Sequence, residues 1–181
     1  MNARLADVTI GVMGSGTDEH DELARGVGAL LAELGVNLLT GGGRGVMTAV
    51  SRAFTHARRE RGICIGIIPC LSQRDRARPK DGYPNEFVEL AISTHLPHSG
   101  TQGKDDLSRN HINVLSCAAL VALPGADGTA AEVALAVDYQ KPVIAYSIDA
   151  ALVEHFSASV RRVARLDEVR EFLCQHIERA V

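Results

Sequence analysis

Residues 124–132, PGADGTAAE, combine residue types that can hold an anion with a carboxylate close by. The apolar run before Pro124 has the pattern of a strand, and the Ala- and Val-rich run after Thr129 has that of a helix. The free N–H groups of a helix's first turn, with the positive end of its dipole, favour a phosphate. Gly125 and Gly128 allow the backbone to approach such a ligand, and Glu132 lies close enough to face it.

The same residues admit a second interpretation, which is a helix cap. Thr129 and Glu132 have the spacing of a capping box, in which each side chain bonds the backbone amide of the other residue. Taken alone, this motif does not decide between a cap and a ligand site.

Two further glycine clusters favour the ligand site. Residues 41–47, GGGRGVM, follow the strand-like run 36–40, and Gly14 and Ser15 follow the strand-like run 8–13. In an open parallel α/β sheet, the loops after the strands gather at one edge, where ligands bind. The candidate ligand-binding residues of the three loops are Gly14, Ser15, Gly42, Gly43, Gly45, Val46, Met47, Pro124, Gly125, Gly128 and Thr129.

These clusters do not match two common nucleotide motifs. No loop reads GxxxxGK followed by Ser or Thr, which argues against an ATPase P-loop. Residues 11–16, GVMGSG, are not GxGxxG, so NAD binding is only weakly supported.

Strand-like and helical patterns alternate along the chain. The apolar, β-branched run 63–68 is typical of a strand buried on both faces, and apolar residues three and four apart predict helices. The expected strands are 8–13, 36–40, 63–68, 87–92, 120–123, 143–146 and 160–163, and the expected helices are 18–34, 46–59, 107–116, 129–139 and 166–177. This order predicts one Rossmann-like α/β domain over residues 1–181, a parallel sheet with helices on both faces.

Composition limits the function classes. The chain has 181 residues and 46% hydrophobic content, which suits a globular domain with a sizeable core. A net charge of −3 implies no general affinity for nucleic acid. No apolar run approaches the ~20 residues that span a bilayer, and residues 1–7 lack the apolar core of a signal peptide. We therefore expect a cytoplasmic protein that binds neither nucleic acid nor membrane.

The cysteines and histidines do not predict a metal site. Cys64 and Cys117 fall in or beside apolar segments, where buried thiols are expected, whereas Cys70 follows a proline at a strand end and is expected to be exposed. His95 and His98 are three residues apart in a loop, but zinc requires more nitrogen or sulfur ligands in a regular array. We expect no metal.

Two stretches do not fit the alternation of strands and helices. Residues 71–86 carry three arginines and a lysine among prolines and a glycine, and residues 94–104 carry two histidines and two glycines. Both come close to the predicted ligand edge, where long loops are often lids. The alternative is a pair of solvated loops.

Three motifs together resemble the signatures of the Lonely Guy (LOG) superfamily. They are GGGRGVM at 41–47, SRNHIN at 108–113 and PGADGTAAE at 124–132, and the resemblance covers nearly the whole chain. It implies a Rossmann-like fold and, commonly, a homodimer. Some members carry an older label, possible lysine decarboxylase. This chain has no evident lysine for pyridoxal phosphate, so we do not expect that activity.

An enzyme branch and a carrier branch of this superfamily are relevant here. The enzyme branch releases a free base from a nucleoside 5′-monophosphate and leaves ribose 5-phosphate. Arg109 and Glu132 would match its catalytic Arg and Glu. Ala126 and Asn110 depart from its signature, which has a second Gly and a Lys at those positions.

The carrier branch resembles molybdenum cofactor carrier proteins. Arg109-x-x-Ile112-Asn113 and residues 128–137, GTAAEVALAV, fit its pattern closely. By local sequence this branch is the nearer one, and Asn113 joins the candidate ligand-binding residues on that resemblance. The implied cargo is a molybdenum cofactor, and no resident cofactor is expected.

Both branches imply the same chemistry at the loops. A phosphate would lie on the amides around Gly128 and Thr129. Arg109 could neutralise it or steady a leaving group, since a guanidinium binds phosphate bidentately. Glu132 could bond a ribose hydroxyl, orient water or stabilise an oxocarbenium-like sugar. The alternative interpretation makes Arg109 a surface residue at a helix start and Asn113 a surface amide.

The sequence therefore predicts a protein that binds a phosphate-bearing, nucleotide-like ligand in the manner of a carrier. The alternative is a nucleoside 5′-monophosphate phosphoribohydrolase. Residues 107–116 and 129–139 are apolar over much of their helical circumference, which predicts that both helices form an isologous dimer contact. The alternative is that other elements of the same chain cover both helices, in which case their apolar faces do not require a dimer.

Overall fold

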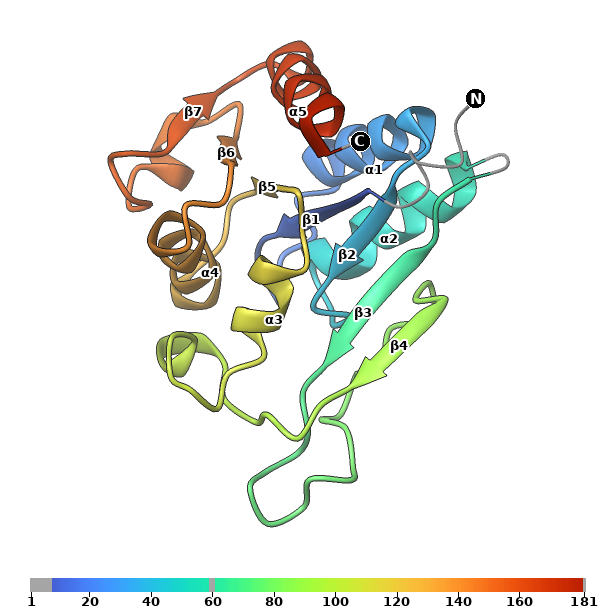
Figure 1. The fold of residues 1–181 in the computed structure, drawn as a ribbon, viewed down its shortest axis with the longest axis vertical. Coiled ribbons are helices and arrows are strands. Elements are labelled where there is room, and N and C mark those ends of the chain that lie inside the picture. The colour runs from blue at the N-terminus through green and yellow to red at the C-terminus, as the bar shows by residue number, and fades with distance from the viewer. Residues whose placement is uncertain (1–7, 59–60, 181) are drawn as a thin grey trace.

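The structure, a computed structural model, describes residues 8–58 and 61–180. Its seven strands form one parallel sheet in the order β4-β3-β2-β1-β5-β6-β7 (Figure 1). The strands are β1 (Thr9–Met13), β2 (Asn37–Thr40), β3 (Cys64–Ile68), β4 (Leu90–Ser93), β5 (Ala119–Ala122), β6 (Val143–Tyr146) and β7 (Arg161–Val163). The expectations about a signal peptide in residues 1–7 and a helix end at residue 59 lie outside the described residues.

Helices cover both faces of the sheet, which confirms the predicted fold class (Figure 1). The helices are α1 (Asp21–Leu34), α2 (Val46–Ala57), α3 (Asn110–Leu115), α4 (Asp127–Asp138) and α5 (Leu166–Ala180), with short 3-10 turns η2 (Gly100–Gln102) and η3 (Ala150–Val153). One core joins the sheet to α1, α2 and α5, and two smaller cores join it to α3 and α4.

The chain reverses its direction of winding between β1 and β5. It runs outward from β1 to β4 and then returns to place β5 beside β1, with Val12 opposite Val121. The loops after these two strands are joined by the Ser15 amide, which donates to the Pro124 carbonyl at 2.9 Å. A switch point of this kind is where open α/β sheets bind ligands.

One glycine sets the end of α1 and another sets the start of α2. Gly35 ends α1 with φ 69°, as the sequence predicted. Gly45 precedes α2 with φ 64°, and a Cβ there would collide with the Ser15 carbonyl. The Val46 amide donates to that carbonyl at 2.9 Å, so the loops after β1 and β2 are packed backbone to backbone.

The structure differs from several predicted boundaries. α1 begins at Asp21 rather than residue 18, β4 begins at Leu90 rather than residue 87, and the starts of α3 and α4 also differ. α4 begins at Asp127 with Ala126 as its N-cap and no side-chain cap, so Thr129 lies inside the helix and the capping-box interpretation is wrong. α3 begins at Asn110 rather than residue 107. The His98 amide bonds the Leu107 carbonyl at 3.1 Å, and His98 forms an isolated bridge with Ser108, so residues 107–109 form a bridge and turns instead of the first turn of the helix.

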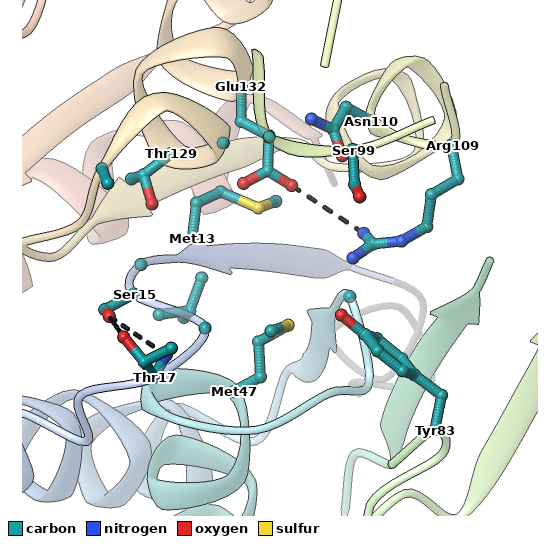
Figure 2. Close-up of a pocket in the computed structure, with 17 residues that line it drawn as sticks. Met13, Ser15, Thr17, Met47, Tyr83, Ser99, Arg109, Asn110, Thr129 and Glu132 are labelled. Atoms are coloured by element: carbon teal, nitrogen blue, oxygen red, sulfur yellow. Dashed lines mark hydrogen bonds and ion pairs between the residues drawn. The ribbon is translucent and has the colours of Figure 1, made fainter. Parts of the chain in front are cut away.

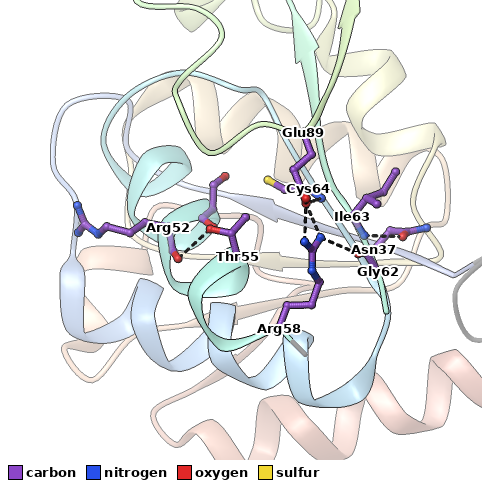
Figure 3. Close-up of polar contacts among 9 residues, drawn as sticks. Asn37, Arg52, Thr55, Arg58, Gly62, Ile63, Cys64 and Glu89 are labelled. Atoms are coloured by element: carbon purple, nitrogen blue, oxygen red, sulfur yellow. Dashed lines mark hydrogen bonds and ion pairs between the residues drawn. The ribbon is translucent and has the colours of Figure 1, made fainter. Parts of the chain in front are cut away.

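A set of hydrogen bonds among Arg58, Glu89 and the backbone of residues 62–64, which we call the polar clamp, joins the starts of β3 and β4 (Figure 3). It lies at the edge of the sheet opposite the glycine loops. Arg58, just after α2, donates through Nη2 to Glu89 Oε1 at 2.8 Å and through Nη1 to the Gly62 carbonyl at 2.9 Å. Glu89 Oε2 accepts the Cys64 amide at 2.9 Å. The Arg58 hydrogen bond is the main cause of the lowered pKa of Glu89.

The cysteines are more buried than the sequence suggested. Cys64 and Cys117 are buried as predicted, and burial raises their pKa to about 11 and about 12, respectively. The expectation that Cys70 is exposed is wrong. Its backbone pairs with Pro79 and its thiol donates to the Ser72 carbonyl at 3.5 Å, which folds the following loop over it.

Candidate functional site

A pocket of about 280 Å³ lies at the carboxyl ends of β1 and β5. This volume is near the lower limit of small-molecule sites. Its walls are formed by Val12, Met13, Gly14, Ser15, Gly16, Thr17, Gly41, Met47, Tyr83, Ser99, Gly100, Arg109, Asn110, Ala126, Gly128, Thr129 and Glu132 (Figure 2).

One side of the pocket, which we call the amide end, consists of Ser15, Thr17, Gly128 and Thr129. The first backbone hydrogen bond of α4 runs from the Ala130 amide to residue 126, so the N–H groups before it have no partner within the helix. The Ser15 hydroxyl accepts the amides of Thr17 and of residue 18 at 3.2 and 2.9 Å, which fixes the facing loop. This end offers amides, hydroxyls and a helix dipole to an anion.

The other side, which we call the guanidinium end, centres on Arg109 (Figure 2). Arg109 is 5% exposed, and its Nε and Nη1 atoms are buried without a hydrogen-bond partner among the described residues. Its guanidinium lies 5.9 Å from the Tyr83 ring centroid and against Gly41, where a Cβ would collide with it. The interpretation of Arg109 as a surface arginine is therefore wrong.

Glu132 lies between the two ends and is shared by two partners. Its Oε1 accepts a hydrogen bond from the side-chain amide of Asn113, Nδ2, at 2.8 Å and lies 3.9 Å from Arg109 Nη1. Burial raises the pKa of Glu132, while the Arg109 charge and the Asn113 hydrogen bond oppose that shift. Asn113 is fully buried, so the interpretation of it as a surface amide is also wrong.

Two segments from the long loops complete the pocket, and we call residues 80–83 and 97–100 the wall segments. Tyr83, Ser99 and Gly100 reach the cavity. Lys80 Nζ joins the two segments, since it donates to the Pro97 carbonyl at 2.6 Å and to Ser99 Oγ at 3.1 Å. Burial lowers the pKa of Lys80, and the charge of Arg109 lowers it further.

The predicted site residues divide into two groups. Those that line the pocket are Gly14, Ser15, Met47, Arg109, Gly128, Thr129 and Glu132. Those that do not line it are Gly42, Gly43, Gly45, Val46, Asn113, Pro124 and Gly125. The second group lies just behind the walls. Val46 packs against Gly14, Gly125 packs against Thr129, and Asn113 holds Glu132.

Gly42 and Gly43 instead support the wall segments. The carbonyl of Gly42 accepts the Asn85 amide at 2.7 Å, and the carbonyl of Gly43 accepts Asn85 Nδ2 at 2.8 Å. A Cβ at Gly43 would lie 2.6 Å from the Tyr83 ring. The triple glycine therefore lets the loop after β2 approach both Arg109 and the segment that carries Tyr83.

Sequence reasoning missed several lining residues, namely Val12, Met13, Gly16, Thr17, Gly41, Tyr83, Ser99, Gly100, Asn110 and Ala126. Seven of them lie within two positions of a predicted residue, so widening each motif by one or two positions finds them. Tyr83, Ser99 and Gly100 are different, because they lie in the long loops and have no motif. The only sequence feature that pointed to them was the closeness of residues 71–86 and 94–104 to the predicted ligand edge.

The described residues contain neither a metal-binding cluster nor a membrane-spanning helix. No three or more His, Cys, Asp or Glu side chains are arranged to hold a metal ion. His98, one of the two loop histidines, instead pairs with Asp105 at 3.2 Å. Within the same residues, no helix has the length and apolar character to cross a membrane.

The sequence and fold have counterparts in known proteins. An uncharacterised protein of Archaeoglobus fulgidus is 35% identical over 136 residues, which are 74% of this chain and 76% of that protein. The molybdenum cofactor binding protein of Rippkaea orientalis is 32% identical with a TM-score of 0.71, over 94% of this chain and 97% of that one. The molybdenum cofactor carrier protein of Chlamydomonas reinhardtii is 28% identical with a TM-score of 0.66, over 94% and 98%.

The comparison with protein families agrees with these likenesses. The model of the SLOG cluster4 family matches residues 7–173, which include every strand, the three glycine loops, Arg109 and Glu132. The chain therefore belongs to the SLOG cluster4 family.

Proposed function

We propose that this protein binds a phosphate-bearing, nucleotide-like small molecule in the pocket and carries it without turnover. One observation supports this most strongly: the unbonded amides of α4 and the buried, unsatisfied Arg109 both face one cavity at the switch point. Backbone amides and a guanidinium are the groups that proteins use to bind phosphate.

Molybdenum cofactor is our candidate cargo. It is the ligand of two structural relatives that share about a third or less of their residues with this chain but over 90% of its length. We place the protein in the cytoplasm as part of the same proposal.

Native mass spectrometry of the purified protein tests the carrier proposal directly. A carrier should retain its cargo, visible as a mass above that of the apo chain. Titration calorimetry with AMP and with ribose 5-phosphate then asks whether the phosphate is the recognised group. A chain that retains nothing and binds neither compound contradicts the proposal.

A phosphoribohydrolase is the second candidate, because Glu132 lies in the pocket beside Arg109. Two features count against it. Glu132 is the single carboxylate among the lining residues, whereas glycoside hydrolysis usually uses two. Ala126 and Asn110, the two departures from the enzyme signature, both line the cavity. Incubation with a panel of nucleoside monophosphates decides between the two, since release of free base from any of them supports the enzyme.

We also propose that the protein is a homodimer through α3 and α4. Leu115 on α3 and Val137 on α4 are exposed, as is Tyr139, which directly follows α4, whereas Val114 and Leu135 are buried in the core of the same chain. The exposed apolar surface that a second copy of the chain could contact is therefore smaller than the apolar pattern of residues 107–116 and 129–139 predicted. Light scattering at micromolar concentration tests the dimer, and a monomer mass excludes it.

A further inference from the structure

The guanidinium end carries more positive charge than its neighbours neutralise. Arg109 and Lys80 are close enough for the charge of one to lower the pKa of the other. Glu132 is the acidic residue that faces Arg109, and its nearer oxygen is 3.9 Å from Nη1, beyond hydrogen-bond distance. That oxygen already accepts a hydrogen bond from the side-chain amide of Asn113.

The donors of Arg109 are also unsatisfied. Its Nε and Nη1 atoms are buried and have no acceptor among the described residues. A buried charged donor without a partner is costly, since it has lost its water without gaining a hydrogen bond. An arginine presents two parallel N–H bonds on each edge that includes Nη2, with Nε on one edge and Nη1 on the other, and this geometry matches two oxygens of one carboxylate or phosphate.

The two anion-binding ends lie on opposite sides of the pocket (Figure 2). Ser15, Thr17 and Thr129 stand on one side and Arg109 with Tyr83 on the other, with Glu132 between them. A phosphate bound at the amide end leaves the Arg109 donors facing the remainder of the ligand. A neutral base or sugar there would offer no charge to match them.

We propose that the natural ligand carries two oxyanionic groups, a phosphate at the amide end and a second phosphate or a carboxylate bound bidentately by Arg109. This proposal rests on the function proposed above and narrows it from one phosphate to a doubly anionic ligand. Lys80 adds a second positive charge behind Ser99. The cavity, at about 280 Å³, limits both groups to one small molecule.

Three ribose compounds form a matched series for the test. Ribose 5-phosphate has a neutral C1 end, ribose 1,5-bisphosphate has a phosphate there, and 5-phosphoribonate has a carboxylate. Calorimetry on the full chain should show that one or both of the doubly charged compounds bind on the order of tenfold to a hundredfold more tightly than ribose 5-phosphate. Whichever of these two compounds binds more tightly identifies the second oxyanionic group as a phosphate or a carboxylate.

Variants connect that preference to Arg109. Arg109→Gln should bring the three affinities close together while ribose 5-phosphate still binds. Arg109→Lys should keep part of the preference for the doubly charged compounds, because lysine retains the positive charge but cannot donate two parallel hydrogen bonds. Arg25→Gln, at an exposed arginine of α1, is the control that leaves the series unchanged. If Arg109→Gln fails to fold because Glu132 has lost its positive neighbour, the double variant Arg109→Gln, Glu132→Gln removes both buried charges.

The outcomes separate this proposal from the more general one. Equal binding of all three compounds by the wild type refutes the second oxyanion and leaves the phosphate carrier standing. Equal weakening of all three by Arg109→Gln also refutes it, because Arg109 would then hold the common phosphate. Binding of none of the three refutes the doubly anionic ligand, and it refutes the carrier as well when native mass spectrometry shows no retained cargo.

Discussion

Replacing Gly128 with valine should weaken ligand binding strongly while leaving the fold intact. A Cβ at Gly128 would lie 3.7 Å from the nearest atoms of Gly100, which is ordinary van der Waals contact, and its φ is outside the left-handed region. The fold therefore accepts a side chain here. The added methyl groups enter the cavity where α4 presents its free amides.

The expected magnitudes differ between binding and stability. A displaced phosphate loses at least one charge-assisted hydrogen bond, about 1.5–3 kcal/mol, and the helix-dipole contribution, about 0.3–1 kcal/mol. Together these predict a Kd weaker by roughly 20- to 1,000-fold. Glycine is the poorer helix former of the two, so the free energy of unfolding should stay within about 0.5 kcal/mol of wild type or rise slightly.

Calorimetric titration with ribose 5-phosphate and a thermal melt measure the two quantities on the same sample. Gly128→Ala, which adds one methyl group, should give an intermediate loss of affinity. Unchanged affinity in the valine variant places the ligand elsewhere and refutes the assignment of the amide end. A fall in unfolding free energy of several kcal/mol refutes the packing argument instead.

Three other changes have distinct expected outcomes. Gly45→Ala should destabilise the protein by about 1–3 kcal/mol in urea melts, because φ 64° and the Ser15 carbonyl both exclude a Cβ. Glu89→Gln should cost about 1 kcal/mol or less at pH 7, since its carboxylate is partly exposed. The lowered pKa of Glu89 stabilises the fold above the unfolded value of about 4.3, so this difference should vanish as pH falls through the folded pKa; a pH-independent difference contradicts the clamp. If the chain is an enzyme, Glu132→Gln should bind nucleotide monophosphates yet release no base, and chromatography that detects release by this variant removes Glu132 from catalysis.

The fold was predictable because its signals are local. Apolar runs such as 63–68 and the helical spacing of α1 and α5 persist over many residues, and the alternation of strand and helix then dictates a parallel sheet. Boundaries failed where tertiary contacts intervene. The pairing of His98 with Leu107 shortens α3, and no property of residues 107–109 alone reveals it.

The candidate site was predictable only in part, for a similar reason. Glycine loops after strands must meet at one edge, so the amide end follows from the sequence. The partnership of Asn113 with Glu132 joins two helices, and the burial of Arg109 depends on Gly41 and Tyr83 from other segments. Such contacts have no local pattern, which is why surface interpretations of Arg109 and Asn113 remained open until the structure was known.

The wall segments have a consequence for how long a ligand stays bound. The amide end is held by the sheet and by α4, so it is already ordered before a ligand arrives and contributes little to the entropic cost of binding. The opposite wall is held across two loops by Lys80, whose hydrogen bonds to the Pro97 carbonyl and Ser99 can break without disturbing the sheet. Residence time would then depend on the Lys80 hydrogen bonds, and affinity on the two anion-binding ends. Sequence changes in residues 80–83 or 97–100 could therefore speed or slow release while the strength of phosphate recognition stays the same.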